Sequence, residues 1–254
     1  MIKPKLLLFV LLSVVAMPSI AAEDEGFKNP LSTIVIDDRE DLALFEQSSL
    51  AALDIFDPFE FWNRRVYHFN QRFDESVFQP VLKGYRFVLP NPVRRSVSHF
   101  FGNLGDVNSL ANSLLQFKLK RSAHITGRVI VNTTVGLAGF FDPASRMGLG
   151  KQTEDFGQTL GFYRVPAGPY LILPVLGPSN FRDAGGRVVD FIGNEQINYL
   201  NVADTTRRHP YILGVYIVNE RYITDFEYGQ MNSPFEYEKL RYVYSRARML
   251  QISD

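Results

Sequence analysis

The sequence predicts a mainly α-helical body with a segment rich in glycine and proline in its second half. Apolar and aromatic residues recur at spacings of three and four between positions 59 and 77, which is the pattern of an amphipathic helix. Asp57-Pro58 and Asn91-Pro92 each place a capping residue before a proline, an arrangement typical of helix starts. Residues 136–186 contain glycine and proline at a density that breaks long helices.

Residues 1–22 are expected to be a signal peptide. Lys3 and Lys5 precede an apolar run at 6–17, and small residues follow at the positions that a signal peptidase reads. The run is shorter than the roughly 18 to 20 residues that span a bilayer, so a transmembrane anchor is the weaker interpretation. The mature chain is therefore expected to be exported and to begin near Ala22.

The next segment, 23–56, is predicted to be an acidic leader with a short helix near 41–53. Residues 23–57 hold ten acidic and two basic side chains, whereas residues 79–128 hold eight basic side chains and one acidic one. The basic stretch is interpreted as a solvated helical face or as a surface near anionic lipid headgroups, where each cation contributes on the order of 1 kcal/mol. Because the chain is exported, nucleic acid is not expected as a partner.

The folded body, 57–230, is expected to open with a long amphipathic helix. Asp57, Pro58 and Glu60 have the spacing of a capping box. The apolar stripe of this helix consists of Phe59, Trp62, Val66, Phe69, Phe73 and Val77. Interruptions are expected at Pro80, Pro90 and Pro92.

Further helices are predicted from their apolar spacing. One begins at Asn91-Pro92, and beyond Gly102 the spacing continues to Phe117. Helices near 122–132 and 210–226 follow by the same criterion. The mixed charge of residues 231–254 predicts a C-terminal surface helix and tail.

The segment 136–186 is expected to be buried or in contact with lipid, since it is also rich in aromatic and aliphatic residues. Its glycines and prolines between positions 157 and 178 favour a hairpin that bends.

Signatures of catalysis are absent from the sequence. Its four histidines are scattered, and it contains no His-Glu-x-x-His pair, no Gly-x-Ser-x-Gly elbow and no phosphate-binding glycine loop. Without cysteine it has no disulfide framework, thiolate metal site or cysteine nucleophile. Asp142, Asp155 and Asp183 are interpreted as helix caps or ion-pair partners of arginines. No enzyme activity, cofactor or metal is expected.

An ordered set of motifs over about residues 55–225 resembles the MlaA/VacJ family. The motifs include Asp57-Pro58-Phe59-Glu60, Asn63-Arg64, Phe69-Asn70, Gly84-Tyr85-Arg86, Asn103-Leu104, Val131-Asn132-Thr133-Thr134, Gly139-Phe140-Phe141-Asp142, Glu154-Asp155-Phe156-Gly157-Gln158-Thr159-Leu160-Gly161, Gly168-Pro169-Tyr170, Leu176-Gly177-Pro178-Ser179 and Arg182-Asp183-Ala184-Gly185.

The resemblance implies a ring-like bundle of amphipathic helices in the inner leaflet of the outer membrane, beside a trimeric porin. In such proteins a polar central channel lets a phospholipid headgroup pass toward a periplasmic carrier of the MlaC type. The resemblance therefore implies a phospholipid transport protein that maintains the lipid asymmetry of the outer membrane. Amphipathic helices with aromatic faces suit a body that lies in a membrane interface.

Ten residues are candidates for the lipid channel or for its hinges. The glycines are the hinge candidates because glycine adopts backbone angles that other residues resist. The candidates are Asn70, Asn132, Asp142, Asp155, Phe156, Gly157, Gly161, Gly168, Arg182 and Asp183.

Two features depart from the family pattern. The cysteine that usually follows the signal's apolar run is missing, so attachment to the periplasmic face of the outer membrane without a lipid anchor is expected. In place of small glycines, this chain has Arg164, Val165, Pro166 and Ala167, which predict a stiffer hairpin.

Two other functions remain open at this stage. The first alternative is a structural or interaction protein that stabilises the outer membrane or its porins without transporting lipid. A periplasmic lipid hydrolase is the second alternative, and it requires a nucleophile and a base that no sequence feature supplies.

Overall fold

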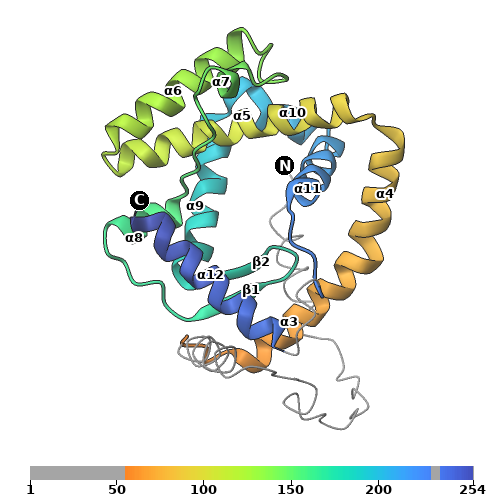
Figure 1. Ribbon diagram of the computed structural model, residues 1–254, viewed down its shortest axis with the longest axis vertical. Coiled ribbons are helices and arrows are strands. Elements are labelled where there is room, and N and C mark those ends of the chain that lie inside the picture. The colour runs from red at the N-terminus through yellow and green to blue at the C-terminus, as the bar shows by residue number, and fades with distance from the viewer. Residues whose placement is uncertain (1–54, 230–234, 254) are drawn as a thin grey trace, which may run out of the picture. The chain divides into compact units, whose positions relative to one another are not determined.

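The computed structural model describes residues 55–229 and 235–253, all within one compact unit. The predicted signal peptide, the helix near 41–53 and nearly all of the acidic leader lie outside the described residues. The prediction of a mainly helical body is confirmed (Figure 1). Its elements are α3 (Glu60–Phe73), a π-helical turn η2 (Asp74–Phe78), α4 (Gln79–Val88), α5 (Asn91–Leu115), α6 (Leu119–Thr134), α7 (Pro143–Arg146), α8 (Phe156–Phe162), β1 (Tyr170–Leu173), β2 (Gly177–Asn180), α9 (Phe181–Ile197), a 3₁₀ turn η3 (Tyr199–Asn201), α10 (Val202–Arg208), α11 (Tyr211–Ile223) and α12 (Glu236–Ser253).

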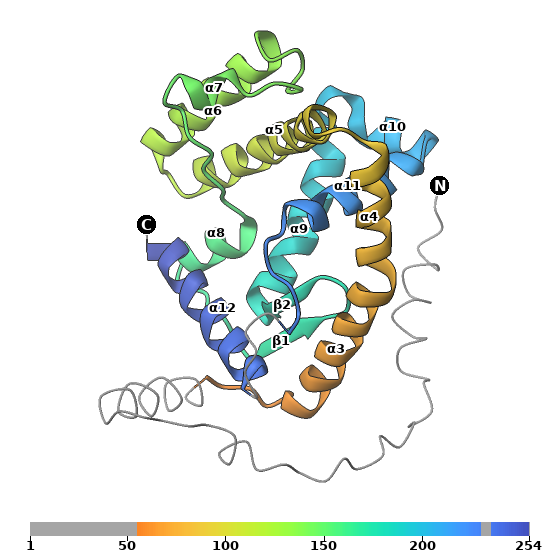
Figure 2. The same ribbon diagram turned by 45° about the vertical axis from the view of Figure 1, so that its right-hand side comes forward.

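Within this unit the helices are arranged as a ring, as the family resemblance implies (Figures 1 and 2). Helices α3 and α4 form one side, α5 crosses one end, and α9 with α8 and α12 forms the opposite side. Helix α6 packs along α5, and the hairpin of β1 and β2 packs against α3 and α9.

The predicted start of the first helix is wrong by two residues. Helix α3 begins at Glu60 after Phe59, and no side chain caps it. The Asp57 carboxylate instead accepts a hydrogen bond from Asn63 Nδ2 (2.8 Å) and contacts Tyr237 and Arg241 of α12. A tertiary contact therefore replaces the local cap.

The expected interruption at Pro80 does not occur. The chain passes from α3 through η2 into α4, and Pro80 lies at the start of α4. The π-helical turn η2 changes the backbone hydrogen-bonding pattern just before Pro80. The N–H that proline lacks therefore falls where the pattern changes from π-helix to α-helix.

Helix α5 is one continuous helix of 25 residues, and it includes the apolar spacing on both sides of Gly102. It begins at Asn91, and Pro90 precedes it in an extended conformation. Gly102 and Gly105 lie in its interior, although each glycine costs a helix about 1 kcal/mol relative to alanine. Packing against α6 and α11 therefore outweighs the local preference.

The hairpin lies at 170–180, later than its prolines and glycines suggested. Strand β1 pairs antiparallel with β2, with Tyr170 opposite Asn180 and Leu173 opposite Gly177. The other edge of β1 is completed by asparagine side chains of α3. Such pairing matters because an exposed strand edge leaves backbone N–H and C=O groups without partners.

Asn63 and Asn70 provide this edge pairing from positions two helical turns apart. Asn63 donates to the carbonyl of Tyr170 (3.1 Å) and accepts from the N–H of Ile172 (2.8 Å). Asn70 donates to the carbonyl of Leu173 (3.0 Å) and accepts from the N–H of Val175 (2.7 Å). The two amides therefore fix the hairpin on α3.

The predicted C-terminal helix is confirmed as α12, but one of its faces is buried instead of lying at the surface. Tyr237 and Leu240 of α12 belong to a buried apolar cluster whose other members are Val66, Tyr67, Tyr170 and Ile172. The sequence predicted no long helix within 136–186. This prediction is wrong at the end of the segment, because the 17-residue helix α9 begins at Phe181 and contains Gly185 and Gly186. The side chain of Asn180 caps α9 by accepting from the N–H of Asp183 (2.8 Å).

Candidate functional site

The described residues place many polar side chains inside the unit and many large apolar ones on its surface. Asn63, Asp106 and Asn219 have no exposed surface, whereas Phe87 is 91% exposed and Phe191 is 67% exposed. Proteins in water rarely expose large contiguous apolar patches, and such patches mark contact with membranes or partner proteins. None of the described helices is long and apolar enough to cross a membrane.

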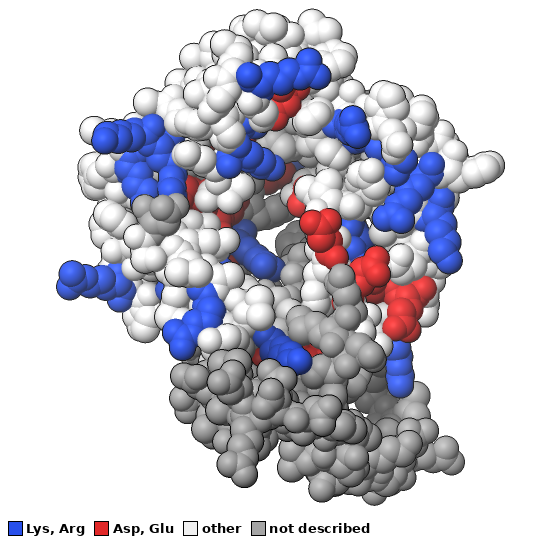
Figure 3. All heavy atoms as spheres, viewed as in Figure 1, with Lys and Arg blue, Asp and Glu red and all other residues white. Residues whose placement is uncertain are grey.

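Charged side chains also gather around a hollow near the centre of the face shown in Figure 3. Both signs are present there, from Lys and Arg and from Asp and Glu. The rim of this hollow therefore carries charges of both signs.

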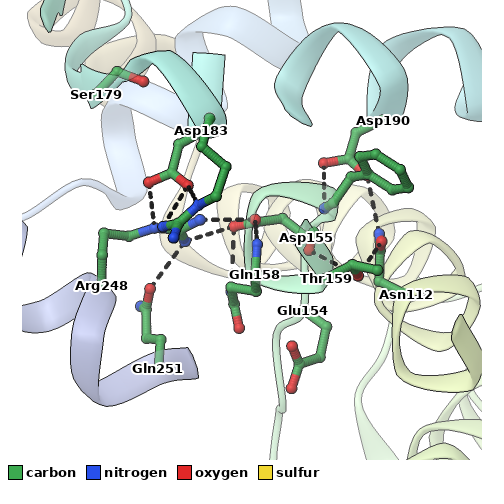
Figure 4. A network of polar contacts seen from close by, with 12 residues as sticks. Asn112, Glu154, Asp155, Gln158, Thr159, Ser179, Asp183, Asp190, Arg248 and Gln251 are labelled. Carbon is green, nitrogen blue, oxygen red and sulfur yellow. Dashed lines mark hydrogen bonds and ion pairs between the residues drawn. The ribbon is translucent and has the colours of Figure 1, made fainter. Parts of the chain in front are cut away.

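A polar network joins α12 to α8 and α9 (Figure 4). Arg248 forms paired contacts with Asp155 (2.7 and 2.8 Å) and donates from Nε to Asp183 (2.8 Å). Asp155 caps α8 by accepting from the N–H of Gln158 (2.8 Å). Tyr244 donates to Asp183 (2.6 Å). We call these five residues the Arg248 network.

The candidate carboxylates are held in their ionised form. Burial raises the pKa of Asp183, but hydrogen bonds from Arg248 and Tyr244 outweigh burial and leave the pKa below its usual range. Burial likewise raises the pKa of Asp142, yet hydrogen bonds from Ser145 and other donors bring it down to about 2. The interpretation of these aspartates as caps or arginine partners is therefore confirmed.

Asp190 makes a second set of contacts beside the Arg248 network. Its carboxylate accepts from Asn112 Nδ2 (2.9 Å) and from the backbone N–H of Phe156 (3.0 Å). Asn112 in turn accepts from the hydroxyl of Thr159 (2.8 Å). These contacts tie the start of α8 to both α5 and α9.

Glu154 is a buried anion with several partners. It accepts from Gln116 Nε2 (2.9 Å) and Lys118 Nζ (3.0 Å), contacts Arg121, and donates its own backbone N–H to Ser109. Two of the eight basic residues between 79 and 128 are therefore used inside the protein.

Arg128 is a third basic residue of that stretch, and it is buried at the junction of α6 and α7. It donates to Asp106 (3.1 Å) and Asp142 (3.3 Å). Asn132 donates to Asp142 (3.0 Å) and accepts from the N–H of Ala144 (3.1 Å). Three of the eight basic side chains over 79–128 therefore pair with carboxylates inside the protein and do not form part of a basic surface.

The three candidate hinge glycines lie in different environments. Gly157 and Gly161 are inside α8 and touch α9 and α12, where an added Cβ would lie 2.6 Å from Asp183 and from Ile252 respectively. Gly168 lies in the loop before β1 and has a φ of +70°, which favours glycine. Packing explains the first two, and hinge motion stays a prediction.

The structure brings six of the ten candidates together and separates the rest. The six at the contact of α8 and α9 are Asp155, Phe156, Gly157, Gly161, Arg182 and Asp183. Asn132 and Asp142 lie at the α6–α7 junction, and Asn70 holds the hairpin.

Three residues that organise this region were not among the candidates, namely Arg248, Asp190 and Glu154. The sequence indicated that the aspartates need arginine partners. No pattern near them in the sequence indicated which arginine it would be. Among the described residues, no group of His, Asp or Glu is arranged to hold a metal ion.

A family model described as MlaA lipoprotein matches residues 55–251. A protein of Rickettsia prowazekii (strain Madrid E) is 34% identical over 198 residues, covering 77% of this chain and 78% of the relative. The intermembrane phospholipid transport system lipoprotein MlaA of Escherichia coli (strain K12) is 37% identical over 139 residues, covering 53% of this chain and 55% of the relative.

A solved structure is also similar, from work on the structural basis for maintenance of bacterial outer membrane lipid asymmetry. It has a TM-score of 0.64 and 29% sequence identity. The match covers 77% of this chain and 98% of the solved chain.

Proposed function

The chain belongs to the MlaA lipoprotein family, and from this we propose that it removes mislocalised phospholipid from the outer leaflet of the outer membrane. The lipid then passes to a periplasmic carrier of the MlaC type. This transport maintains the lipid asymmetry of that membrane.

The observation that carries this proposal is the polar interior inside an apolar exterior. A phospholipid has the same division between its headgroup and its tails. A ring with this distribution offers the headgroup hydrogen-bonding partners while the tails contact apolar side chains. Carrying a charged headgroup through an apolar environment without such partners is costly.

Membrane attachment follows from the exposed apolar side chains. The 254 residues contain no cysteine, so we propose that the body itself contributes to attachment at the periplasmic face. Full burial of one Phe or Leu side chain contributes roughly 1.5–3 kcal/mol. Several such side chains, Phe87 and Phe191 among them, supply a substantial part of the binding free energy. A trimeric porin is the proposed partner within the membrane.

No chemical step is part of this proposal. A general base works best with a pKa near the operating pH. The pKa of Asp142 is about 2, and those of Asp155 and Asp183 lie below their usual range. These carboxylates are therefore poor proton acceptors at neutral pH.

Transfer between vesicles tests this proposal. The purified protein, in donor vesicles of phosphatidylethanolamine with a periplasmic carrier present, is expected to pass intact phospholipid to acceptor vesicles without nucleotide. Mass spectrometry of the lipids before and after transfer checks that they are unchanged. Release of fatty acid by the protein alone would favour the hydrolase, and binding to a porin without any transfer would favour the interaction protein.

A further inference from the structure

A cavity of about 350 Å³ lies between α5, α9, α10 and α11, outside the polar networks described above. Its size is in the range of small-molecule sites, which span about 300–1,000 Å³. Its lining is mainly apolar and includes Phe101, Leu104, Phe191, Leu213, Tyr216 and Ile223. It is an apolar space in a unit whose buried side chains are largely polar.

Two glycines of α5 help to create this space. Gly102 and Gly105 are one helical turn apart, and both line the cavity. A Cβ added at Gly105 would meet nothing within 4 Å, and one at Gly102 would meet only Lys151 Nζ at 3.4 Å. Packing therefore does not require glycine at either position, although both glycines disfavour the helix. Their effect is to leave room beside α5.

Charged groups lie on the wall of this otherwise apolar cavity. Lys151, Glu195 and Glu220 line it, and Glu195 is already paired with Arg207 of α10. Burial raises the pKa of Glu220, and the positive charge of Lys151 acts in the opposite direction. The cavity thus combines an apolar body with a cation that can face an anionic group.

We propose that this cavity binds one acyl chain of a lipid, with the lipid's anionic head near Lys151. This proposal rests on the proposed function, because a phospholipid in transit exposes its tails. The apolar lining excludes a headgroup as the occupant of the cavity body, since its polar atoms would lose their hydrogen bonds to water. A free fatty acid shares the chemistry of a chain with an anionic end.

Photo-crosslinking with the full chain tests the proposal. The probes are phosphatidylethanolamine and a free fatty acid, each carrying a diazirine at the end of the acyl chain. Either probe is expected to label peptides 101–107 and 191–216. The probe that gives the stronger labelling identifies whether the acyl chain comes from a phospholipid or from a free fatty acid. A phosphatidylethanolamine with its diazirine on the headgroup is expected to label these peptides weakly.

Filling the cavity supplies the decisive variant. Gly105→Phe is expected to reduce acyl labelling of these peptides about tenfold, equivalent to about 1.4 kcal/mol of binding free energy. Gly84→Phe is the matched control, because Gly84 is a helical glycine of α4 with open space around it and no place in the cavity wall. Labelling in the control is expected to remain unchanged. If Gly105→Phe does not fold, Gly102→Leu replaces it, since its Cβ meets only the end of Lys151.

Unchanged labelling in the filled variant would overturn the proposal. Absence of labelling in the native protein would also overturn the proposal. That result is expected if another part of the protein fills the cavity. Lipid transfer is measured on the same samples. Transfer without cavity labelling removes this inference and leaves the proposed function, whereas labelling without transfer removes the proposed function and leaves an acyl-binding cavity.

Discussion

Replacing Arg248 by Met is expected to lower the free energy of unfolding at pH 7 by about 1.5–3 kcal/mol. The side chain of Arg248 is 13% exposed and that of Asp183 is 3% exposed. Without the guanidinium, Asp183 keeps a buried negative charge, and Asp155 loses both of its contacts to α12. Arg182 still pairs with Asp183 (3.0 Å), but the loss of the charge-assisted hydrogen bonds from Arg248 outweighs the apolar contacts that Met provides.

The effect of this substitution depends on pH in a defined direction. The pKa of Asp183 is lowered in the folded protein, so its contribution to stability is present above the unfolded carboxyl pKa of about 3.9. That contribution is lost as pH falls through the lower, folded pKa. The difference between Arg248→Met and the native protein is therefore expected to shrink below about pH 4.

Urea unfolding at several pH values measures both effects. Arg246→Met is the matched control. Arg246 lies on the exposed face of the same helix, where its guanidinium stacks on the ring of Tyr242. The control is expected to change stability by less than about 0.5 kcal/mol. Equal stability of the two variants would show that the Arg248 network does not hold α12.

Replacing Gly186 by Ala is expected to destabilise the protein by about 1–3 kcal/mol. A Cβ at this position would lie 2.4 Å from the backbone nitrogen of Gly157 and 2.8 Å from its Cα. Because the obstacle is backbone, α8 has to move away from α9. Alanine's better helix propensity, worth roughly 0.5–1 kcal/mol, does not offset that movement.

The neighbouring glycine provides the control. A Cβ at Gly185 would meet nothing within 4 Å, so Gly185→Ala is expected to stabilise the protein by about 0.5–1 kcal/mol. Thermal unfolding followed by circular dichroism compares the two substitutions. The same sign of change for both would contradict the close approach of α8 and α9.

Helix positions were the most predictable part of the fold. The apolar spacings predicted α3, α5, α6 and α11, because each helix has to present a face to its neighbours. Helix ends were less predictable. Asp57 has the sequence of a cap, yet its partners include Tyr237, which lies 180 residues away.

The C-terminal helix shows why charge patterning misled the prediction of exposure. Mixed charge usually marks a solvated face, but Arg241 and Arg248 find buried aspartates from distant parts of the chain. The hairpin was incompletely predicted for a similar reason. Its outer edge is completed by Asn63 and Asn70, and no pattern within 157–178 contains that information.

The candidate site was predictable in part. The resemblance selected Asp155 and Asp183, whose capping and pairing were confirmed. Arg248 is 93 residues from Asp155 and lies in a different element, so it could be found only from the fold. The cavity requires four helices, and its glycines look like ordinary helix interruptions in the sequence.

The most direct test of the central claim is the amount of phospholipid in the outer leaflet of the outer membrane. A membrane-impermeant amine reagent measures it as phosphatidylethanolamine accessible from outside the cell. Cells lacking this protein are expected to show a rise that the native chain reverses. An unchanged outer-leaflet content in those cells, with the porins still assembled normally, would contradict phospholipid removal as the function.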